Sequence, residues 1–245
     1  MPQATPGHRP VETKGRENVI VLVHGGGGNA HEMQPFADAI QPRMECIGLT
    51  LIGHGGRPIP AGYTLDDMAD DLAANIRRTG LKQPFLFGYC GGAIAVLNLL
   101  TRYHGIAKGA VLLGPRYRFD EDVIRHYTHL LSEDFLLRPG SLLAKGFEET
   151  QGPRWIEVAR NQRRMFEALR ERPAIDQSRL AAIDCPVMVI GPTDDPLTTF
   201  AEAQNLVRAI PRAELLKLNG PAHPPQLLPY PQIADHTVRF FQSIG

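Results

Sequence analysis

The chain has 245 residues, enough to bury one large hydrophobic core, and mixed α/β chains of this size usually form a single domain. Its 26 lysines and arginines balance 26 aspartates and glutamates, so no net charge favours nucleic acid or an anionic membrane surface as a partner. The three cysteines, Cys46, Cys90 and Cys185, lack C-x-x-C spacing, which argues against a disulfide framework and a zinc site. Residues 1–18 are polar and no later apolar run reaches membrane-spanning length, so we expect a cytoplasmic protein with a small-molecule partner.

Short runs of β-branched and apolar residues recur along the chain, separated by segments with helical patterns. This alternation predicts an α/β fold with a mostly parallel sheet of six to eight strands, flanked by helices on both faces. The predicted strands are residues 19–23, 44–51, 85–89, 110–113, 187–190 and 215–218.

Three helices are predicted from periodicity. Over residues 64–79 apolar side chains recur at helical spacing, with Thr64 as the N-cap and Asp67 three residues later. Residues 92–100 are apolar nearly all round, which predicts a helix buried behind the centre of the sheet. A last helix is expected near residues 232–242.

The strand and helix alternation stops between residues 115 and 184, where charged, helix-compatible sequence contains no convincing strand. Such an excursion is too long for an ordinary loop, and it predicts a helical cap over the carboxyl edge of the sheet. We therefore expect one domain, with a core of residues 1–114 and 185–245 and an inserted cap of residues 115–184. Prolines and glycines would divide the cap into three or four helices.

Cys90 is the strongest candidate for a nucleophile. It lies in Gly88-Tyr89-Cys90-Gly91-Gly92, between a predicted strand and a predicted buried helix, which is the context of a G-x-S-x-G-type elbow. The glycines allow strand and helix to pack closely around a strained turn. A thiol at a helix N-terminus is biased toward thiolate. Taken alone, the motif fits a buried structural cysteine equally well.

A glycine run, residues 25–28, directly follows the first predicted strand and His24. Glycines leave backbone N–H groups free to point into the crevice, so Gly26 is the expected first donor of an oxyanion hole. Gly91, directly after Cys90, is the expected second donor. A glycine run can also bind phosphate, but neither G-x-x-x-x-G-K-[ST] nor a dinucleotide fingerprint is present. We therefore favour the oxyanion interpretation.

Candidates for a base and an orienting acid also follow predicted strands. His223 comes after the last strand and Asp195 after the strand before it. Because the carboxyl ends of parallel strands meet at the working crevice of an open α/β sheet, both side chains are expected near Cys90. The chain order of nucleophile, acid and base is the order that this hydrolase arrangement requires. The alternatives are a surface-loop histidine and a turn aspartate.

Together these motifs resemble the α/β-hydrolase superfamily, in its capped group of esterases, thioesterases, carbon-carbon bond hydrolases and cofactor-free perhydrolases. The resemblance covers residues 18–241 and includes residues 52–56, which are similar to the family's G-H-G-x-S turn. It implies Cys90 as nucleophile, His223 as base, and Gly26 and Gly91 as oxyanion donors.

The acid implied by the resemblance depends on the residue from which the count starts. Counting from Pro186 places the family's aspartate at Asp195, and counting from Gly191 places it at Asp194. We favour Asp195, because the count from Pro186 also keeps the family's separation between the aspartate and His223.

The chain departs from the family pattern in the turn after the second strand and at the nucleophile. Thr50 stands where the family usually has aspartate, and Gly56 or Arg57 where the turn closes with serine, so we expect a locally rearranged turn. Cysteine replaces the usual serine at the elbow. A thioester intermediate passes its acyl group to amines or thiols more readily, relative to water, than an oxygen ester does, which favours thioester substrates or acyl transfer.

The cap carries more arginines than glutamates between residues 154 and 172. This surplus fits an entry path for a coenzyme A or carrier-protein thioester, or for a carboxylated substrate. It fits an ordinary solvated helix face at least as well. Candidate substrate contacts are His31, Tyr117 and Trp155. The six arginines are Arg154, Arg160, Arg163, Arg164, Arg170 and Arg172.

The sequence therefore predicts a cofactor-independent hydrolase or acyltransferase without a metal, acting as a monomer or homodimer on a small ester, thioester or lactone through a Cys-His-Asp triad. One alternative is a carbon-carbon bond hydrolase or lyase in which His223 acts mainly as a base. The other is a non-catalytic ligand receptor on the same fold.

Overall fold

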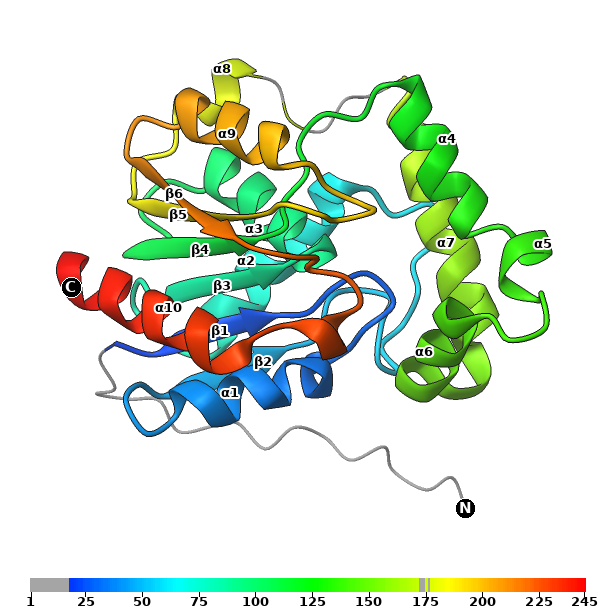
Figure 1. The fold of residues 1–245 in the computed structure, drawn as a ribbon, viewed down its shortest axis with the longest axis horizontal. Helices are drawn as coiled ribbons and strands as arrows, with labels where there is room; N and C mark the ends of the chain where they lie inside the picture. The colour runs from blue at the N-terminus through cyan, green and yellow to red at the C-terminus, as the bar shows by residue number, and fades with distance from the viewer. Residues whose placement is uncertain (1–17, 172–174, 176) are drawn as a thin grey trace.

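The computed structural model describes residues 18–171, 175 and 177–245, and it contains one six-stranded sheet (Figure 1). The strand order is β2-β1-β3-β4-β5-β6, and every neighbouring pair is parallel. The α/β fold with six to eight parallel strands is thus confirmed. The strands are β1 (Ile20–Val23), β2 (Cys46–Leu49), β3 (Phe85–Tyr89), β4 (Gly109–Leu113), β5 (Val187–Pro192) and β6 (Ala213–Leu218).

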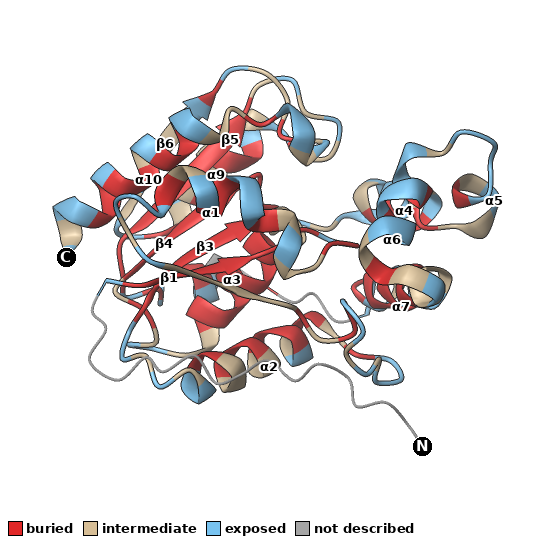
Figure 2. Cartoon of the chain, turned by 90° about the horizontal axis from the view of Figure 1, so that it is seen from below, coloured by how far each residue is buried: buried red, intermediate tan, exposed pale blue. Residues whose placement is uncertain are grey.

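Helices cover both faces of the sheet, and the strands alternate accordingly. Ile20 and Leu22 of β1 belong to the cluster under α1 (Gln34–Ile40) and α10 (Tyr230–Ile244), whereas Val21 and Val23 belong to the cluster under the helices of the opposite face. Both sets are fully buried, as Figure 2 shows for the central strands. Burial on both faces explains why these strands are continuous apolar runs. The opposite face carries α2 (Leu65–Arg78), α3 (Gly91–Arg102) and α9 (Phe200–Ala209).

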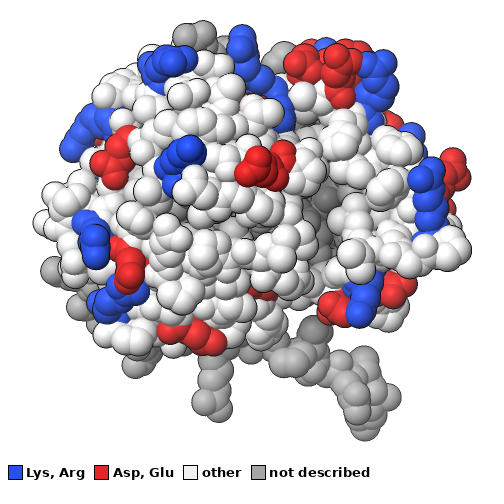
Figure 3. Space-filling model, viewed as in Figure 1, with Lys and Arg blue, Asp and Glu red and all other residues white. Residues whose placement is uncertain are grey.

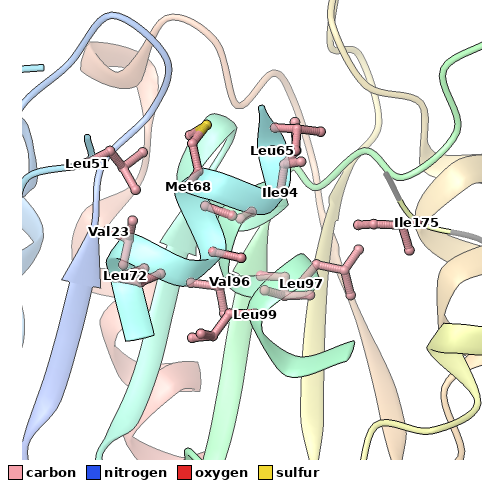
Figure 4. Packing of buried hydrophobic residues seen from close by; sticks show 14 of the residues in the cluster. Val23, Leu51, Leu65, Met68, Leu72, Ile94, Val96, Leu97, Leu99 and Ile175 are labelled. Carbon is pink, nitrogen blue, oxygen red and sulfur yellow. The ribbon is translucent and has the colours of Figure 1, made fainter. Parts of the chain in front are cut away.

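The predicted helix over residues 64–79 forms as α2. Thr64 Oγ1 accepts the N–H of Asp67, and the Asp67 carboxylate accepts the N–H of Thr64, which completes a capping box. The apolar side of α2, including Leu65 and Met68, packs against α3 in the same cluster as Ile94 (Figure 4). This packing fixes the position of α3, and with it the turn at its N-terminus.

Five helices between β4 and β5 lie at one end of the sheet, and we refer to them as the cap helices (Figures 1 and 2). A further short helix of this segment, α8 (Gln177–Leu180), packs against α3 of the core instead. Within the described ranges, no helix is both long and apolar enough to cross a membrane. The cap helices are α4 (Glu121–Leu130), α5 (Glu133–Leu136), α6 (Leu142–Gln151), η2 (Gly152–Arg154) and α7 (Trp155–Ala168).

A buried ion pair fixes the point where the chain leaves β4 for the cap. Arg116 Nη1 lies 2.8 Å from Glu202 Oε2, and both side chains are about nine-tenths buried. Arg116 also donates to the carbonyl of Leu197, and Glu202 accepts the backbone N–H groups of Tyr117 and Arg118. The start of the cap is therefore tied to α9 and to the loop after β5.

Candidate active site

Cys90 lies on a sharp turn between β3 and α3. Its backbone has φ 48° and ψ −112°, a strained conformation for a residue with a side chain, of the kind that costs about 1–3 kcal/mol. The turn is held by hydrogen bonds, because Cys90 N–H donates to Leu113 O at 2.9 Å and Ile94 N–H donates to Cys90 O at 3.1 Å. Strain supported in this way is typical of a residue whose side chain must be presented in one direction.

The glycines around Cys90 are required by close backbone approach. A Cβ on Gly88 would lie 2.6 Å from Gly92 O, and a Cβ on Gly91 would lie 2.7 Å from the backbone nitrogen of Gly26. Neither position has room for a side chain. The same packing brings the glycine run after β1 against the start of α3.

His223 contacts the fully buried carboxylate of Asp195. Its Nδ1 lies 2.8 Å from Oδ2 and 3.0 Å from Oδ1 of Asp195, whose side chain has no exposed surface. Oδ1 also accepts the N–H groups of Leu197 and Thr198, and Oδ2 accepts those of Ala222 and His223. These donors hold the carboxylate ionised and fixed against the imidazole.

Asp194, the other candidate acid, points elsewhere. It is exposed, and its carboxylate accepts a hydrogen bond from Thr193 Oγ1 at 2.9 Å. The carboxylate beside His223 is therefore that of Asp195.

Tyr89, the last residue of β3, holds the other side of the His223 ring. The two rings stack with centroids 5.3 Å apart, and Tyr89 Oη donates to Ala222 O at 2.8 Å. No sequence pattern predicts this contact, because a tyrosine beside the elbow is equally suited to the core.

The charges around His223 favour its protonated form. Burial alone lowers its pKa, but the charge of Cys90 and the hydrogen bond to Asp195 outweigh burial and raise the pKa to about 10. For Asp195 burial raises the pKa, and the hydrogen bonds and charge of His223 lower it to about 2. Nε2 of His223 is buried and makes no hydrogen bond of normal geometry within the described residues. Because Nδ1 faces Asp195, the free Nε2 is the nitrogen available to Cys90.

Two backbone amides lie beside Cys90 with no acceptor of their own. The N–H groups of Gly26 and Gly91 donate to no other group in the described part of the chain, and both residues line a cavity together with Cys90. Both amides are therefore available to a ligand in this cavity, beside Cys90.

Glu32, in η1 (Ala30–Met33), is a buried carboxyl that sequence analysis missed. Its Oε2 accepts the N–H of Gly25 at 2.7 Å and so supports the glycine run. Burial raises its pKa, and the hydrogen bond from Gly25 and the charge of His223 lower it, giving about 7. The only signal in the sequence is an acidic residue shortly after the glycines.

Gln151 was also missed, and it joins the cap to the glycine run. Its Nε2 donates to Gly27 O at 2.8 Å and to Gly28 O at 2.6 Å, and its Oε1 accepts the N–H of Gly55 at 2.7 Å. One buried side chain at the end of α6 therefore bonds both to the glycine run and to the turn after β2.

The turn after β2 is held by the side chain of Arg57. Arg57 donates to Thr50 O at 2.6 Å, and its guanidinium forms two 2.7 Å hydrogen bonds with the carboxylate of Asp71 in α2.

The cavity at Cys90 is small, about 90 Å³, and lies between the core and the cap helices. Its walls are mainly apolar, and its polar groups are those of Cys90, the glycine amides, His54, two tyrosines and Gln162. The apolar lining residues are Leu65, Met68, Ile94, Leu130, Leu131, Leu143, Phe147, Met165, Phe166 and Leu197.

The three residues proposed as substrate contacts do not line this cavity. His31 is exposed in η1, and Tyr117 lies under the guanidinium of Arg118 with its N–H bound to Glu202. Trp155 lines a separate, shallower hollow of the cap near Leu136. The residues that do line the cavity come both from the core, at the start of α2 and α3, and from the cap helices α4, α6 and α7.

The arginines of the cap are largely neutralised by neighbours. Arg160 pairs with Glu133 and Arg170 with Glu121, and Arg154 and Arg163 pair with glutamates on their own helical segment. Figure 3 shows basic and acidic side chains next to each other over this part of the surface. Arg172 lies outside the described residues.

Comparisons with known proteins agree with this architecture. Residues 20–236 match the model of a family described as "Alpha/beta hydrolase family". The chain is 25% identical to "Putative carbamate hydrolase RutD" of Pantoea ananatis, over 83% of this chain and 81% of that protein. It is 27% identical to "AB hydrolase superfamily protein YisY" of Bacillus subtilis, over 87% of each.

Solved structures give the same fold at lower identity. The enol-lactonase of Burkholderia xenovorans LB400 superposes with a TM-score of 0.72 at 17% identity, covering 95% of this chain and 93% of that one. A thermophilic esterase of Thermogutta terrifontis superposes with a TM-score of 0.74 at 19% identity, covering 94% and 91%. With the family model matching most of its length, the chain belongs to the alpha/beta hydrolase family and is a hydrolase.

Proposed function

We propose that this hydrolase attacks the carbonyl carbon of a small ester, thioester or lactone with Cys90 and works through an acyl-enzyme. The observation that carries the proposal is the buried 2.8 Å contact between His223 and Asp195, with the free Nε2 of His223 available to the thiol of Cys90. A base held in this way by a carboxylate is the arrangement that activates a nucleophile.

In this mechanism His223 and Cys90 react as an imidazolium and a thiolate. The sulfur forms a bond to the carbonyl carbon, and the carbonyl electrons move onto oxygen, where the N–H groups of Gly26 and Gly91 stabilise the charge. When the tetrahedral intermediate collapses, the leaving group takes the proton from His223. Water then attacks the thioester while His223 accepts its proton, and the acid product leaves Cys90 as thiolate. In acyl transfer an amine, thiol or alcohol takes the place of water.

The cavity supports a small acyl group. Its volume of about 90 Å³ is well below the ~150 Å³ of an engineered cavity that holds benzene. The paired arginines of the cap leave little net positive charge to bind a phosphate-bearing carrier. The proposal therefore concerns the acyl group of the substrate, and a coenzyme A or carrier-protein thioester stays a prediction. We also propose that residues 115–184, with the cap helices, set the size of the acyl group.

The experiment is a panel of p-nitrophenyl esters, acyl thioesters of a simple thiol, small lactones and aryl carbamates; the last are included because several relatives are named carbamate hydrolases. Intact-protein mass spectrometry of rapidly quenched samples should show a mass increase equal to the acyl group. Cys90→Ala should abolish the adduct, and Cys90→Ser should move it to an oxygen ester that turns over more slowly.

The control is Asp194→Asn, which changes an exposed residue outside the site and should form the adduct like the natural chain. Full turnover by Cys90→Ala together with complete loss in His223→Ala would contradict the acyl-enzyme. That result would favour the alternative in which the histidine acts alone as the base.

A further inference from the structure

Gln162, in the cap helix α7, reaches the cavity from the side opposite the sheet. Its side chain is 95% buried, and it lines the cavity together with Gly26, Cys90 and Gly91. A buried amide among apolar walls is costly unless each polar atom finds a partner, so the partner of each atom matters.

The nitrogen of the Gln162 amide has a partner in the core. Its Nε2 contacts Nε2 of His54, and Nδ1 of His54 lies 2.8 Å from Ile52 O. A carbonyl can only accept, so Nδ1 carries the proton. Burial lowers the pKa of His54 to about 4 despite the bond to Ile52, which keeps the ring neutral and leaves Nε2 as an acceptor. Gln162 must therefore direct its NH₂ group at His54.

The oxygen of the amide consequently faces the other way, toward the glycine run. Oε1 lies 3.5 Å from the position that a Cβ on Gly26 would occupy. No group among the described residues donates a hydrogen bond to it. Oε1 is therefore an acceptor open to a mainly apolar cavity, where a ligand that carries a donor can bind it.

We infer that Gln162 Oε1 is a specificity-determining acceptor for a hydroxyl or N–H group attached next to the scissile carbonyl of the substrate. The inference rests on the proposed function, since it places the carbonyl oxygen at the N–H of Gly26, beside Oε1. A carbonyl oxygen would be repelled by Oε1, whereas a donor one or two atoms away satisfies it. The substrate class is therefore 2-hydroxyacyl compounds, or carbamoyl compounds with an N–H in the same place.

The test compares substrates that differ only in this donor. Glycolyl and propionyl thioesters of one thiol differ by OH against CH₃, and phenyl carbamate and phenyl acetate differ by NH₂ against CH₃. We expect the natural chain to favour the donor-bearing member of one pair by about 10-fold or more in kcat/KM. The pair that shows the preference identifies whether the donor is a hydroxyl or an N–H.

Gln162→Met keeps the length of the side chain and removes the acceptor. It should lower kcat/KM for the preferred donor-bearing substrate by about 10- to 100-fold and change its CH₃ partner by less than about 3-fold. Met165→Leu is the matched control, because Met165 lines the same cavity without a polar atom and should leave the ratio within a pair unchanged.

Two outcomes overturn the inference. One is equal loss for both members of each pair in Gln162→Met, which would give Gln162 a structural role through His54. The other outcome is measured on the natural chain alone: a higher kcat/KM for the propionyl than for the glycolyl thioester, together with a higher kcat/KM for phenyl acetate than for phenyl carbamate. Failure of the proposed function looks different, because then no substrate of either pair would acylate Cys90.

Discussion

Replacing Asp195 by asparagine tests the central contact of the site, and the structure gives its magnitude. Surrounding groups lower the pKa of Asp195 from 3.8 to about 2, and its side chain is fully buried. At about 1.4 kcal/mol per pH unit, the ionised carboxylate contributes about 2 kcal/mol to folding at neutral pH. Because the folded-state pKa is depressed, this contribution is present above roughly pH 4 and is lost as the pH falls through about 2.

Asparagine adds a second cost. Each carboxylate oxygen of Asp195 accepts two backbone N–H groups, so the NH₂ of asparagine must face two donors whichever way it is turned. Leaving these donors unpaired costs about 1–3 kcal/mol more. We therefore expect Asp195→Asn to be destabilised by about 3–5 kcal/mol at pH 7. Its kcat/KM should fall by about 10²- to 10⁴-fold, because the orientation and charge of His223 are no longer fixed.

The assay is urea unfolding at pH 7 and pH 4 together with hydrolysis of a p-nitrophenyl ester. Asp194→Asn is the matched control, since Asp194 is exposed and bonds to its neighbour Thr193, and it should lose no more than about 0.5 kcal/mol and little activity. The reasoning is refuted if Asp195→Asn retains natural stability and activity, or if Asp194→Asn shows the same losses.

Four further substitutions probe buried polar groups. Tyr63→Phe removes a buried hydroxyl that has no hydrogen-bond partner among the described residues, so it should be neutral or stabilise the fold by about 1 kcal/mol. Tyr89→Phe breaks a hydrogen bond and should cost about 1 kcal/mol. Urea midpoints compare the two variants, and a loss of stability in Tyr63→Phe would contradict this reasoning. The pKa of Glu32 is raised to about 7, so the stability that its protonated form contributes is complete below about pH 4.5 and is lost as the pH rises through 7. Between pH 4.5 and 8, the free energy of unfolding of Glu32→Gln should therefore rise by about 3 kcal/mol relative to that of the natural chain. Parallel curves of stability against pH for the two proteins would exclude the effect. Gln151→Leu leaves the carbonyl of Gly28 and the N–H of Gly55 without this partner, while Gly27 O keeps Thr150 Oγ1 as a donor. It should lower the free energy of unfolding by about 2–4 kcal/mol, measured against the conservative Gln151→Glu. Equal stability of Gln151→Leu and the natural chain would rule out the bridge.

The parts of the fold that could be predicted are those encoded locally. The four central strands, β1, β3, β4 and β5, are runs of mainly apolar residues buried on both faces, and α2 begins at a capping box of two residues three apart. The candidates Cys90, Asp195 and His223 were found because each follows a strand, and parallel strands bring their carboxyl ends together. The choice between Asp194 and Asp195 needed the structure, because adjacent residues of a turn differ in direction and not in sequence context.

The contacts that escaped prediction join segments far apart in the chain. Gln162 meets His54 across 108 positions, and Gln151 meets Gly27 across 124, so both depend on how the cap is set on the core. Trp155 was expected at the site because it is large and aromatic, but the orientation of α7 turns the side of Gln162 and Phe166 toward Cys90 instead. Periodicity defines which side of a helix is apolar, and it does not define which cavity that side meets.

The bridge made by Gln151 has a consequence for enzyme engineering. Exchanging the segment between β4 and β5 would replace much of the cavity lining, and that segment also supplies the bonds that hold Gly27, Gly28 and Gly55. A chimaera with a foreign segment would keep Cys90, Asp195 and His223 but would lose the side chain that bonds to the glycine run. The exchange should therefore be designed with the boundary after residue 151, or with a glutamine grafted at that place.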